Sequence, residues 1–214
     1  MNGQNNKMTT GISALVLGKQ GRHEDGRSGV IMQELTGYQL IQLAVFPDQI
    51  ARFQTSLMQL INIDQLADIS SSARTSNMIL LRPEFTKFWL VRQRGGEQTF
   101  FKALAHYFPL DLTGSKVVVR LSGADAARLI NRFCAVDLSC PKGKFLATAL
   151  HHVPVHILKS SATAYLLFLP RSYAESLAEL LYHSALQFGV DVKSVAEWSL
   201  SLIHISEPTR PSII

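Results

Sequence analysis

Histidine and cysteine are the residue types in this chain that could bind a metal, and they gather in two short segments. His151, His152 and His156 lie close together, and Cys134 and Cys140 form a C-x5-C pair upstream. A zinc site needs three or four ligands within reach of one another. On a strand His152 and His156 would share one face and His151 would oppose it, and C-x5-C is not a usual ligand spacing. We expect no metal site, and interpret the histidines as a solvated strand edge with one partly buried ring.

Motifs for cofactor binding and nucleophilic catalysis are missing from the sequence. There is no G-x-G-x-x-G, and Gly143-Lys144 lacks the upstream glycine and the following Ser or Thr of a P-loop. There is no G-x-S-x-G motif, and the serine run 70–72 is interpreted as a loop. No two carboxylates are placed for acid–base chemistry. We therefore expect this chain to carry no catalytic residue and to bind no cofactor.

Three arginines are the polar side chains that we single out, because each ends or interrupts an apolar strand. They are Arg82, Arg120 and Arg171. An arginine in such a place can bind a carboxylate bidentately across an interface. It can also be a surface residue whose aliphatic stem packs on the protein. We predict these three as candidate partner-interface residues and keep the surface interpretation open.

The composition is that of an ordinary folded protein. The chain has 214 residues, of which 47% are hydrophobic and 17% charged, which is enough for one large domain or two small ones. The net charge of +5 comes from scattered cations without a run of like charge, so a solvated surface or a docking face for an acidic partner is favoured over nucleic-acid binding. A ferredoxin-like RNA binder would need exposed strand aromatics, whereas Phe88 and Trp89 are expected in the core.

The location that we expect is the cytoplasm. The polar first residues do not form a secretory leader, and no apolar stretch approaches the roughly 18 residues of a membrane span. Two cysteines define no disulfide framework, so the thiols are expected to be reduced.

Hydrophobic periodicity predicts an alternation of strands and helices along the chain. The predicted helices are residues 48–63, 97–108, 124–134 and 172–188, the last with a capping box at Ser172 and Glu175 and a cap at Gly189. The predicted strands are residues 29–34, 38–46, 77–83, 87–93, 116–122, one or two within 145–158, and 164–170.

The predicted elements recur with a nearly constant offset. Ile41 and Val117 are 76 residues apart, and so are Ile79 and Val155. The repeated order of strand, helix, strand, strand, helix is that of the split β-α-β, ferredoxin-like arrangement. The fold class that we predict is α+β, with two tandem ferredoxin-like halves, antiparallel sheets and a pseudo-repeat of about 76 residues.

Four segments follow from this organisation. Residues 1–28 are predicted as a flexible N-terminal arm, 29–110 as the first ferredoxin-like half and 111–198 as the second. Residues 199–214 contain SLIHISEPTRP, which looks like the translation of a sequencing-library adapter. We interpret this last segment as a non-native tail and base no functional hypothesis on it.

The second half resembles the gamma subunit family of heterotetrameric sarcosine oxidase. Residues 111–138 match its Asp-Leu-Ser/Thr start, its strand ending in R-L-S-G, its D-A-hydrophobic helix and its Cys-x-x-Asp-Leu close. Further on, residues 170–174 match the P-R-S-[FY]-A start of a helix. The resemblance covers about residues 12–195 and is weaker in the first half. The linker between Leu138 and Phe145 is shorter than the Pro-rich stretch usual in the family.

This resemblance implies a role without catalysis. The family complex oxidises sarcosine to glycine, with hydrogen peroxide and either formaldehyde or, with tetrahydrofolate, 5,10-methylenetetrahydrofolate. The resemblance assigns FAD, FMN and NAD to the large subunits, and makes the alpha, beta and delta subunits the expected partners. The gamma subunit resembles the folate-binding domain of aminomethyltransferases in fold and is regarded as structural.

Two other functions remain open at this point. The equivalent subunit of N-methylglutamate dehydrogenase would have the same features. A free-standing folate-dependent protein of the aminomethyltransferase type would need an acid that contacts folate in a central cavity, and usually a longer chain.

Overall fold

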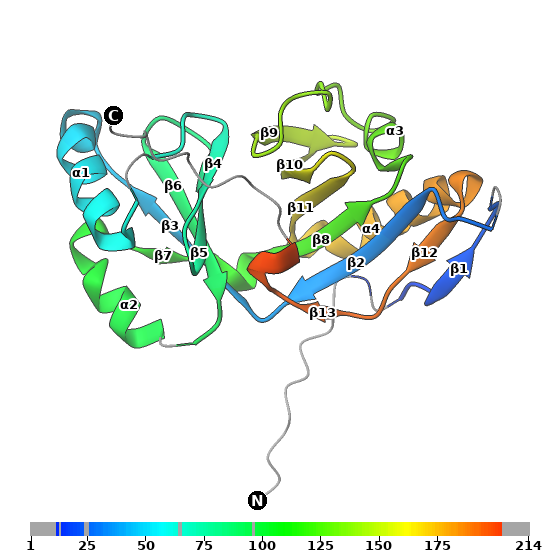
Figure 1. Cartoon of the computed structure of the whole chain (residues 1–214), viewed down its shortest axis with the longest axis horizontal. Coiled ribbons are helices and arrows are strands. Elements are labelled where there is room, and N and C mark those ends of the chain that lie inside the picture. Colours follow the sequence, from blue (N-terminus) through cyan, green and yellow to red (C-terminus); the bar gives the residue numbers. More distant parts are fainter. Residues whose placement is uncertain (1–11, 13, 24–25, 64–65, 96, 203–214) are drawn as a thin grey trace, which may run out of the picture.

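Two lobes lie side by side in the computed structural model, which describes residues 12, 14–23, 26–63, 66–95 and 97–202 (Figure 1). Each lobe contains one sheet, and most neighbouring strands run antiparallel. The prediction of an α+β fold with antiparallel sheets is confirmed at this level. The calls on residues 1–11 and 203–214 lie outside the described residues.

The sheet of the first lobe has five strands in the order β4-β5-β6-β3-β7. Its strands are β3 (Tyr38–Ala44), β4 (Ser71–Arg74), β5 (Met78–Arg82), β6 (Lys87–Gln93) and β7 (Leu110–Asp111). Two helices, α1 (Ile50–Ile61) and α2 (Glu97–Ala103), belong to this lobe, and the 3-10 turn η2 (Ala105–Tyr107) follows α2. The serine run that we interpreted as a loop in fact leads into β4, an edge strand whose one buried residue is Ala73.

The sheet of the second lobe has eight strands, seven of them in the order β1-β12-β2-β8-β11-β10-β9, with β13 beside β2. Its strands are β1 (Gly18–Gln20), β2 (Val30–Thr36), β8 (Lys116–Ser122), β9 (Phe145–Leu150), β10 (Val153–Ser161), β11 (Ala164–Pro170), β12 (Val190–Val192) and β13 (Ala196–Glu197). Its helices are α3 (Ala126–Ile130) and α4 (Ala174–Ala185).

Helix α1 forms where the sequence places an apolar residue every fourth position. Phe53, Leu57 and Ile61 are its buried residues, and burial of side chains of this size contributes about 1.5–3 kcal/mol each. They pack on the outer face of the first sheet with Ile41 and Leu43 of β3. In the second lobe, α4 is attached in the same way, but no side-chain hydrogen bond caps its start, so the predicted capping box is wrong.

Each sheet has an apolar core on the side of its helices. A third apolar layer lies between the two sheets and is built almost entirely from strands. Leu40, Trp89 and Val91 of the first sheet meet Leu166 and Phe168 of the second. Since α1 and α4 contribute to the two other cores and not to this one, the sheets pack face to face with helices outside. The two lobes therefore share one continuous apolar contact.

Strands β2 and β3 form a nearly continuous segment that passes from one sheet into the other. Gly37 separates them with a φ of 69°, a conformation that glycine adopts without strain. β2 pairs with β8 and β12 of the second sheet, whereas β3 pairs with β6 and β7 of the first. The sequence grouped residues 29–36 with the first half because they precede β3, but their pairing assigns them to the second sheet.

The offset of 76 residues does not hold on every strand. Ile41 and Val117 both face the outer helices. Ile79, however, faces the layer between the sheets, whereas Val155 faces the helices. Successive side chains of a strand point to opposite faces, so a shift of one residue is enough to exchange the faces.

Part of the segment predicted as a flexible arm is packed on the second lobe. β1 pairs with β12, and the Arg22 amide donates to the carbonyl of Leu186 at 2.9 Å. Ile12 and Leu15 are buried in the core beneath α3 and α4. The polar and glycine-rich composition of this segment led to the prediction of a flexible arm, but the side chains of Ile12 and Leu15 hold it to the second lobe.

Candidate functional site

The predicted interface arginine Arg82 is a buried residue of β5. Only 8% of its surface is exposed, and its guanidinium donates to the carbonyls of Ala67 at 3.3 Å and Phe85 at 3.2 Å. The guanidinium carbon also lies 5.0 Å from the centre of the Phe88 ring. These contacts hold the loop before β4 and the turn after β5 to the sheet.

The other two predicted arginines belong to the second lobe. Arg120 lies on the same face of β8 as Val118, toward the other sheet, and its Nε is buried without a hydrogen bond in the described part of the chain. Arg171 follows β11 and donates to the carbonyls of Gly114 at 2.7 Å and Lys116 at 3.2 Å. The three arginines thus have different surroundings, and their role at an interface stays a prediction.

The histidine pair lies in a turn and not on a strand, contrary to the sequence-based interpretation. His151 and His152 form the two-residue connection between β9 and β10, and their φ values are 45° and 71°. Hairpins with two such residues usually contain Asn-Gly, so the sequence carried no turn signal here. Cys134 and Cys140 are free thiols. Among the described residues, no three His, Cys, Asp or Glu side chains are grouped to hold a metal ion.

His156 lies in an aromatic cluster between the sheets. Its ring centre is 4.5 Å from that of Trp89 and 5.3 Å from that of Phe145, with which it stacks at 19°. Burial lowers the pKa of His156 to about 4, and the positive charge of Lys116 adds to the shift. Because Nδ1 has no hydrogen bond within the described residues, this histidine acts as a neutral, flat packing residue.

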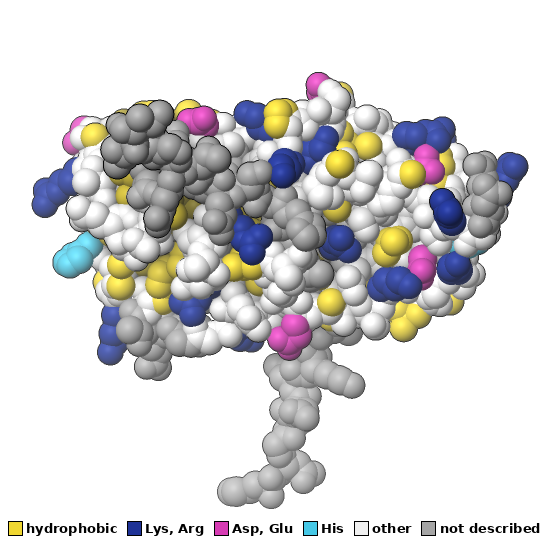
Figure 2. Space-filling model, in the orientation of Figure 1, with side chains coloured by type: hydrophobic (Ala, Val, Ile, Leu, Met, Phe, Trp, Pro, Cys, Tyr) yellow, Lys and Arg dark blue, Asp and Glu magenta, His cyan; other side chains and the backbone are white. Residues whose placement is uncertain are grey.

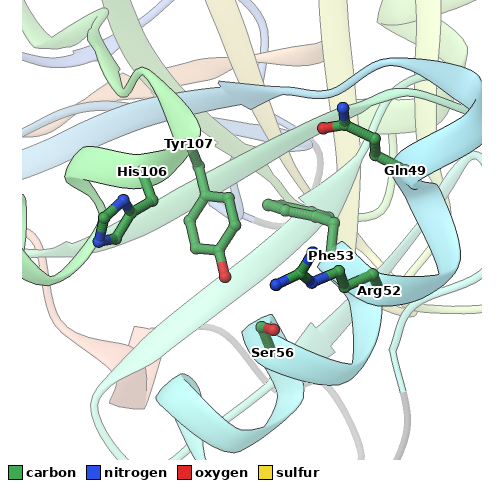
Figure 3. Close-up of a pocket in the computed structure, with 6 residues that line it drawn as sticks. All are labelled: Gln49, Arg52, Phe53, Ser56, His106 and Tyr107. Atoms are coloured by element: carbon green, nitrogen blue, oxygen red, sulfur yellow. The ribbon is translucent and has the colours of Figure 1, made fainter.

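A pocket of about 460 Å³ opens on the outer side of the first lobe, between α1 and η2. Arg52 and Ser56 line it from one face of α1, because residues four apart are neighbours there, and Gln49 lines it from the 3-10 turn that precedes the helix. His106 and Tyr107 line it from η2 (Figure 3). In this view the Tyr107 hydroxyl points toward Arg52 and Ser56, whereas the His106 ring lies to one side.

The floor of this pocket is aromatic. Phe53 is buried, and its ring meets that of Tyr107 edge-on, with the centres 4.8 Å apart and the planes at 85°. The same ring lies 5.0 Å from Phe88. The backbone of Tyr107 is held by its amide, which donates to the carbonyl of Leu104 at 2.8 Å. The pocket therefore joins an apolar floor to a polar rim.

Two exposed aromatic residues are attached to the segments that line this pocket. Phe46, with 72% of its surface exposed, precedes the turn that contains Gln49. Phe108, at 86%, directly follows Tyr107.

A second pocket, of about 530 Å³, lies on the other lobe and is lined by Arg22, Arg27 and Arg128 among others. Asp125 also lines it and forms an ion pair with Arg128 at 2.6 Å. The rest of the visible face has Lys and Arg side chains spread over both lobes with a few acidic ones among them (Figure 2).

Arg52, His106 and Tyr107 were not predicted as functional residues. The polar face of α1 is visible in the sequence as the counterpart of its apolar stripe, but such a face is usually only solvated. What brings it opposite η2 is the end of α2 at Ala103 and the turn that follows. No helix in the described part of the chain has the length and apolar character needed to cross a membrane.

Comparison with known proteins gives a fold but no family. No protein-family profile matches the chain, and no curated protein matches it in sequence. A chain of the heterotetrameric sarcosine oxidase from Corynebacterium sp. U-96, solved with pyrrole 2-carboxylate, is similar with a TM-score of 0.68 at 19% identity, over 79% of this chain and 88% of that chain. The aminomethyltransferase T of the glycine cleavage system from Bartonella henselae has a TM-score of 0.59 at 20% identity, over 79% of this chain and 48% of that chain. At these identities the likeness establishes the fold alone.

Proposed function

We propose that this chain is the gamma subunit, or a close equivalent, of a heterotetrameric sarcosine oxidase. The observation that carries the proposal is the match to one chain of such an oxidase, which covers 88% of that chain. A shared fold over most of that chain is what a subunit in the same role would give. The motif residues 111–138 and 170–174 add a resemblance in sequence.

In this role the chain has no reacting group of its own. The proposed complex oxidises sarcosine to glycine, with hydrogen peroxide and formaldehyde or 5,10-methylenetetrahydrofolate as the further products. The alpha, beta and delta subunits are the proposed partners, with FAD, FMN, NAD and tetrahydrofolate bound there, in the cytoplasm. N-methylglutamate dehydrogenase is the alternative complex.

The proposal includes a finer description of the fold, as two tandem ferredoxin-like halves. Strands β4-β5-β6-β3 of the first sheet and β9-β10-β11-β8 of the second have the same order relative to the chain. The same two-lobed arrangement supports the aminomethyltransferase-like alternative. The match spans about half of that enzyme's length.

The test is reconstitution with the other subunits. We would co-express this chain with the alpha, beta and delta subunits of a heterotetrameric sarcosine oxidase, and expect one complex of equal stoichiometry by size-exclusion chromatography and native mass spectrometry. The purified lone chain should show neither flavin absorbance nor sarcosine oxidation, and omission of this chain should reduce the yield of the assembled oxidase.

Three outcomes would reject the proposed subunit role or favour one of the alternatives. Transfer of a one-carbon unit to tetrahydrofolate by the lone chain would favour the aminomethyltransferase-like alternative. A complex that assembles to full yield without the chain, and from which the added chain elutes separately, would reject the subunit role. Oxidation of N-methylglutamate in place of sarcosine by the assembled complex would identify the alternative dehydrogenase.

A further inference from the structure

We propose that the pocket between α1 and η2 binds a small organic carboxylate with an apolar body. This proposal does not rest on the subunit role, and the site uses none of the three arginines predicted at the partner interface. Its approximate volume of 460 Å³ falls within the range of small-molecule sites, about 300–1,000 Å³.

The polar groups of the rim are suited to an anion. Arg52 supplies a guanidinium, which matches the two oxygens of a carboxylate with two parallel N–H donors. The hydroxyls of Ser56 and Tyr107 can each donate one more hydrogen bond, and both lie near the guanidinium in Figure 3. Within the described residues, no side-chain hydrogen bond or ion pair engages Arg52 or the Tyr107 hydroxyl, so both are available to a ligand.

The charge carried by the described lining of the pocket favours a negative ligand. The described lining contains one arginine, one histidine and no Asp or Glu. The acidic residue closest in sequence, Asp48, precedes Gln49 but is not part of the lining. Arg52 is an exposed residue, and the aromatic wall on one side of it strengthens its attraction for an anion relative to a guanidinium in open water.

The floor determines what the rest of the ligand must be. Phe53 and Tyr107 present ring surface on the inner side of the pocket, and only an apolar group gains by displacing water there. A carboxylate carries one charge, which the single guanidinium balances, whereas a phosphate dianion would leave charge unpaired. A small aromatic or branched aliphatic acid therefore fits better than inorganic phosphate.

The experiment is a titration of the full chain with benzoate, benzamide and inorganic phosphate, followed by amide chemical shifts and by isothermal calorimetry. Benzamide has nearly the shape of benzoate but no charge. We expect benzoate to bind at least about tenfold more tightly than benzamide or phosphate, with shifts confined to residues 49–56 and 104–108. Arg52→Gln should weaken benzoate about tenfold, which corresponds to about 1.4 kcal/mol.

Three further variants make the test specific. Arg52→Lys keeps the charge without the planar fork and should retain part of the affinity, and Tyr107→Phe should lose about threefold. Arg132→Gln removes an exposed charge from the other lobe and should change nothing. Equal binding of benzoate and benzamide, tighter binding of phosphate, unchanged binding to Arg52→Gln, or shifts centred on Arg128 would each overturn the proposal.

Discussion

The two lobes cover the outer faces of their sheets in opposite ways. The first lobe has a long first helix, α1 with 12 residues, and a short second one, α2 with seven. In the second lobe the first helix, α3, has five residues and the second, α4, has 12. Each lobe therefore has one helix too short to cover its part of the sheet.

The lobes differ in what fills the space beside the short helix. In the second lobe, Ile12, Leu15 and Leu138 come from outside the helices and complete the core. In the first lobe, Ala67 and Leu104 also come from outside the helices and join the core, and a pocket lined by Arg52 and Tyr107 is open next to η2. A pocket therefore lies beside the short helix of each lobe, but the one beside α3 contains the Arg128–Asp125 ion pair, whereas no ion pair engages Arg52 among the described residues.

The apolar layer between the sheets, which both lobes share, should make the largest contribution to the free energy of unfolding. Phe168→Ala removes a fully buried ring from this layer and should lower the free energy of unfolding by about 3–5 kcal/mol. Because the layer belongs to both lobes, amide exchange should accelerate in both sheets. Phe108→Ala, at a side chain that is 86% exposed, is the control, and protection lost in the second lobe alone would show that the lobes are energetically separate.

The covering segment of the second lobe should be the next most important. Leu15→Ala, at a side chain that is 9% exposed, should cost about 2–3 kcal/mol and should loosen α3 and α4 first. Leu17→Ala is the matched control, since that leucine is 60% exposed. If urea unfolding gave the two variants the same midpoint, the packed N-terminal segment would be irrelevant to this lobe.

Acid should weaken the contact between the lobes through His156. Its folded-state pKa of about 4 lies below the usual 6.5, so the unfolded chain takes up the proton first. The stability that depends on the neutral ring is present above about pH 6.5 and is lost as the pH falls toward 4, by on the order of 2 kcal/mol. His156→Phe should remove this difference between urea unfolding at pH 7 and at pH 4.5, and an unchanged pH dependence in the variant would contradict the assignment.

The smallest effect is expected at the β9–β10 turn of the second lobe. His151 and His152 both have positive φ, which costs about 1–2 kcal/mol per non-glycine residue. Replacing the pair by Asn-Gly should raise the free energy of unfolding by about 1 kcal/mol without changing either lobe's core. Thermal unfolding measures this gain in stability, and a lower midpoint in the Asn-Gly variant would show that the His151-His152 turn is not strained.

The strongly apolar elements could be predicted from the sequence. The bounds of β6, β8 and β11 agree with the predicted strands 87–93, 116–122 and 164–170, because each is a run of residues buried on both faces. Short strands such as β4 could not be predicted, since their residues are polar and only pairing with β5 defines them. The place of β2 in the second sheet could not be predicted either, because it follows from pairing with the distant strands β8 and β12.

The candidate pocket shows where sequence reasoning ends. The stripe of Phe53, Leu57 and Ile61 predicts which face of α1 is buried, and hence that Arg52 lies near its edge. It does not predict what lies opposite. What lies opposite depends on the turn at Phe108, whose φ of 47° ends η2. Glycine or asparagine usually occupies such a position, so the sequence does not indicate this turn.

The placement of β2 has a consequence for how the protein is made. Every strand of the first sheet lies between Tyr38 and Asp111, so this sheet can close while the chain is still being synthesised. β2, made earlier, must wait for its parallel partner β12 at Val190–Val192. Until then an apolar strand has an unpaired edge on the nascent chain. Between the synthesis of Asp111 and that of Val192 the first sheet can be complete while the second is not, and this is the interval in which a chaperone would protect the chain.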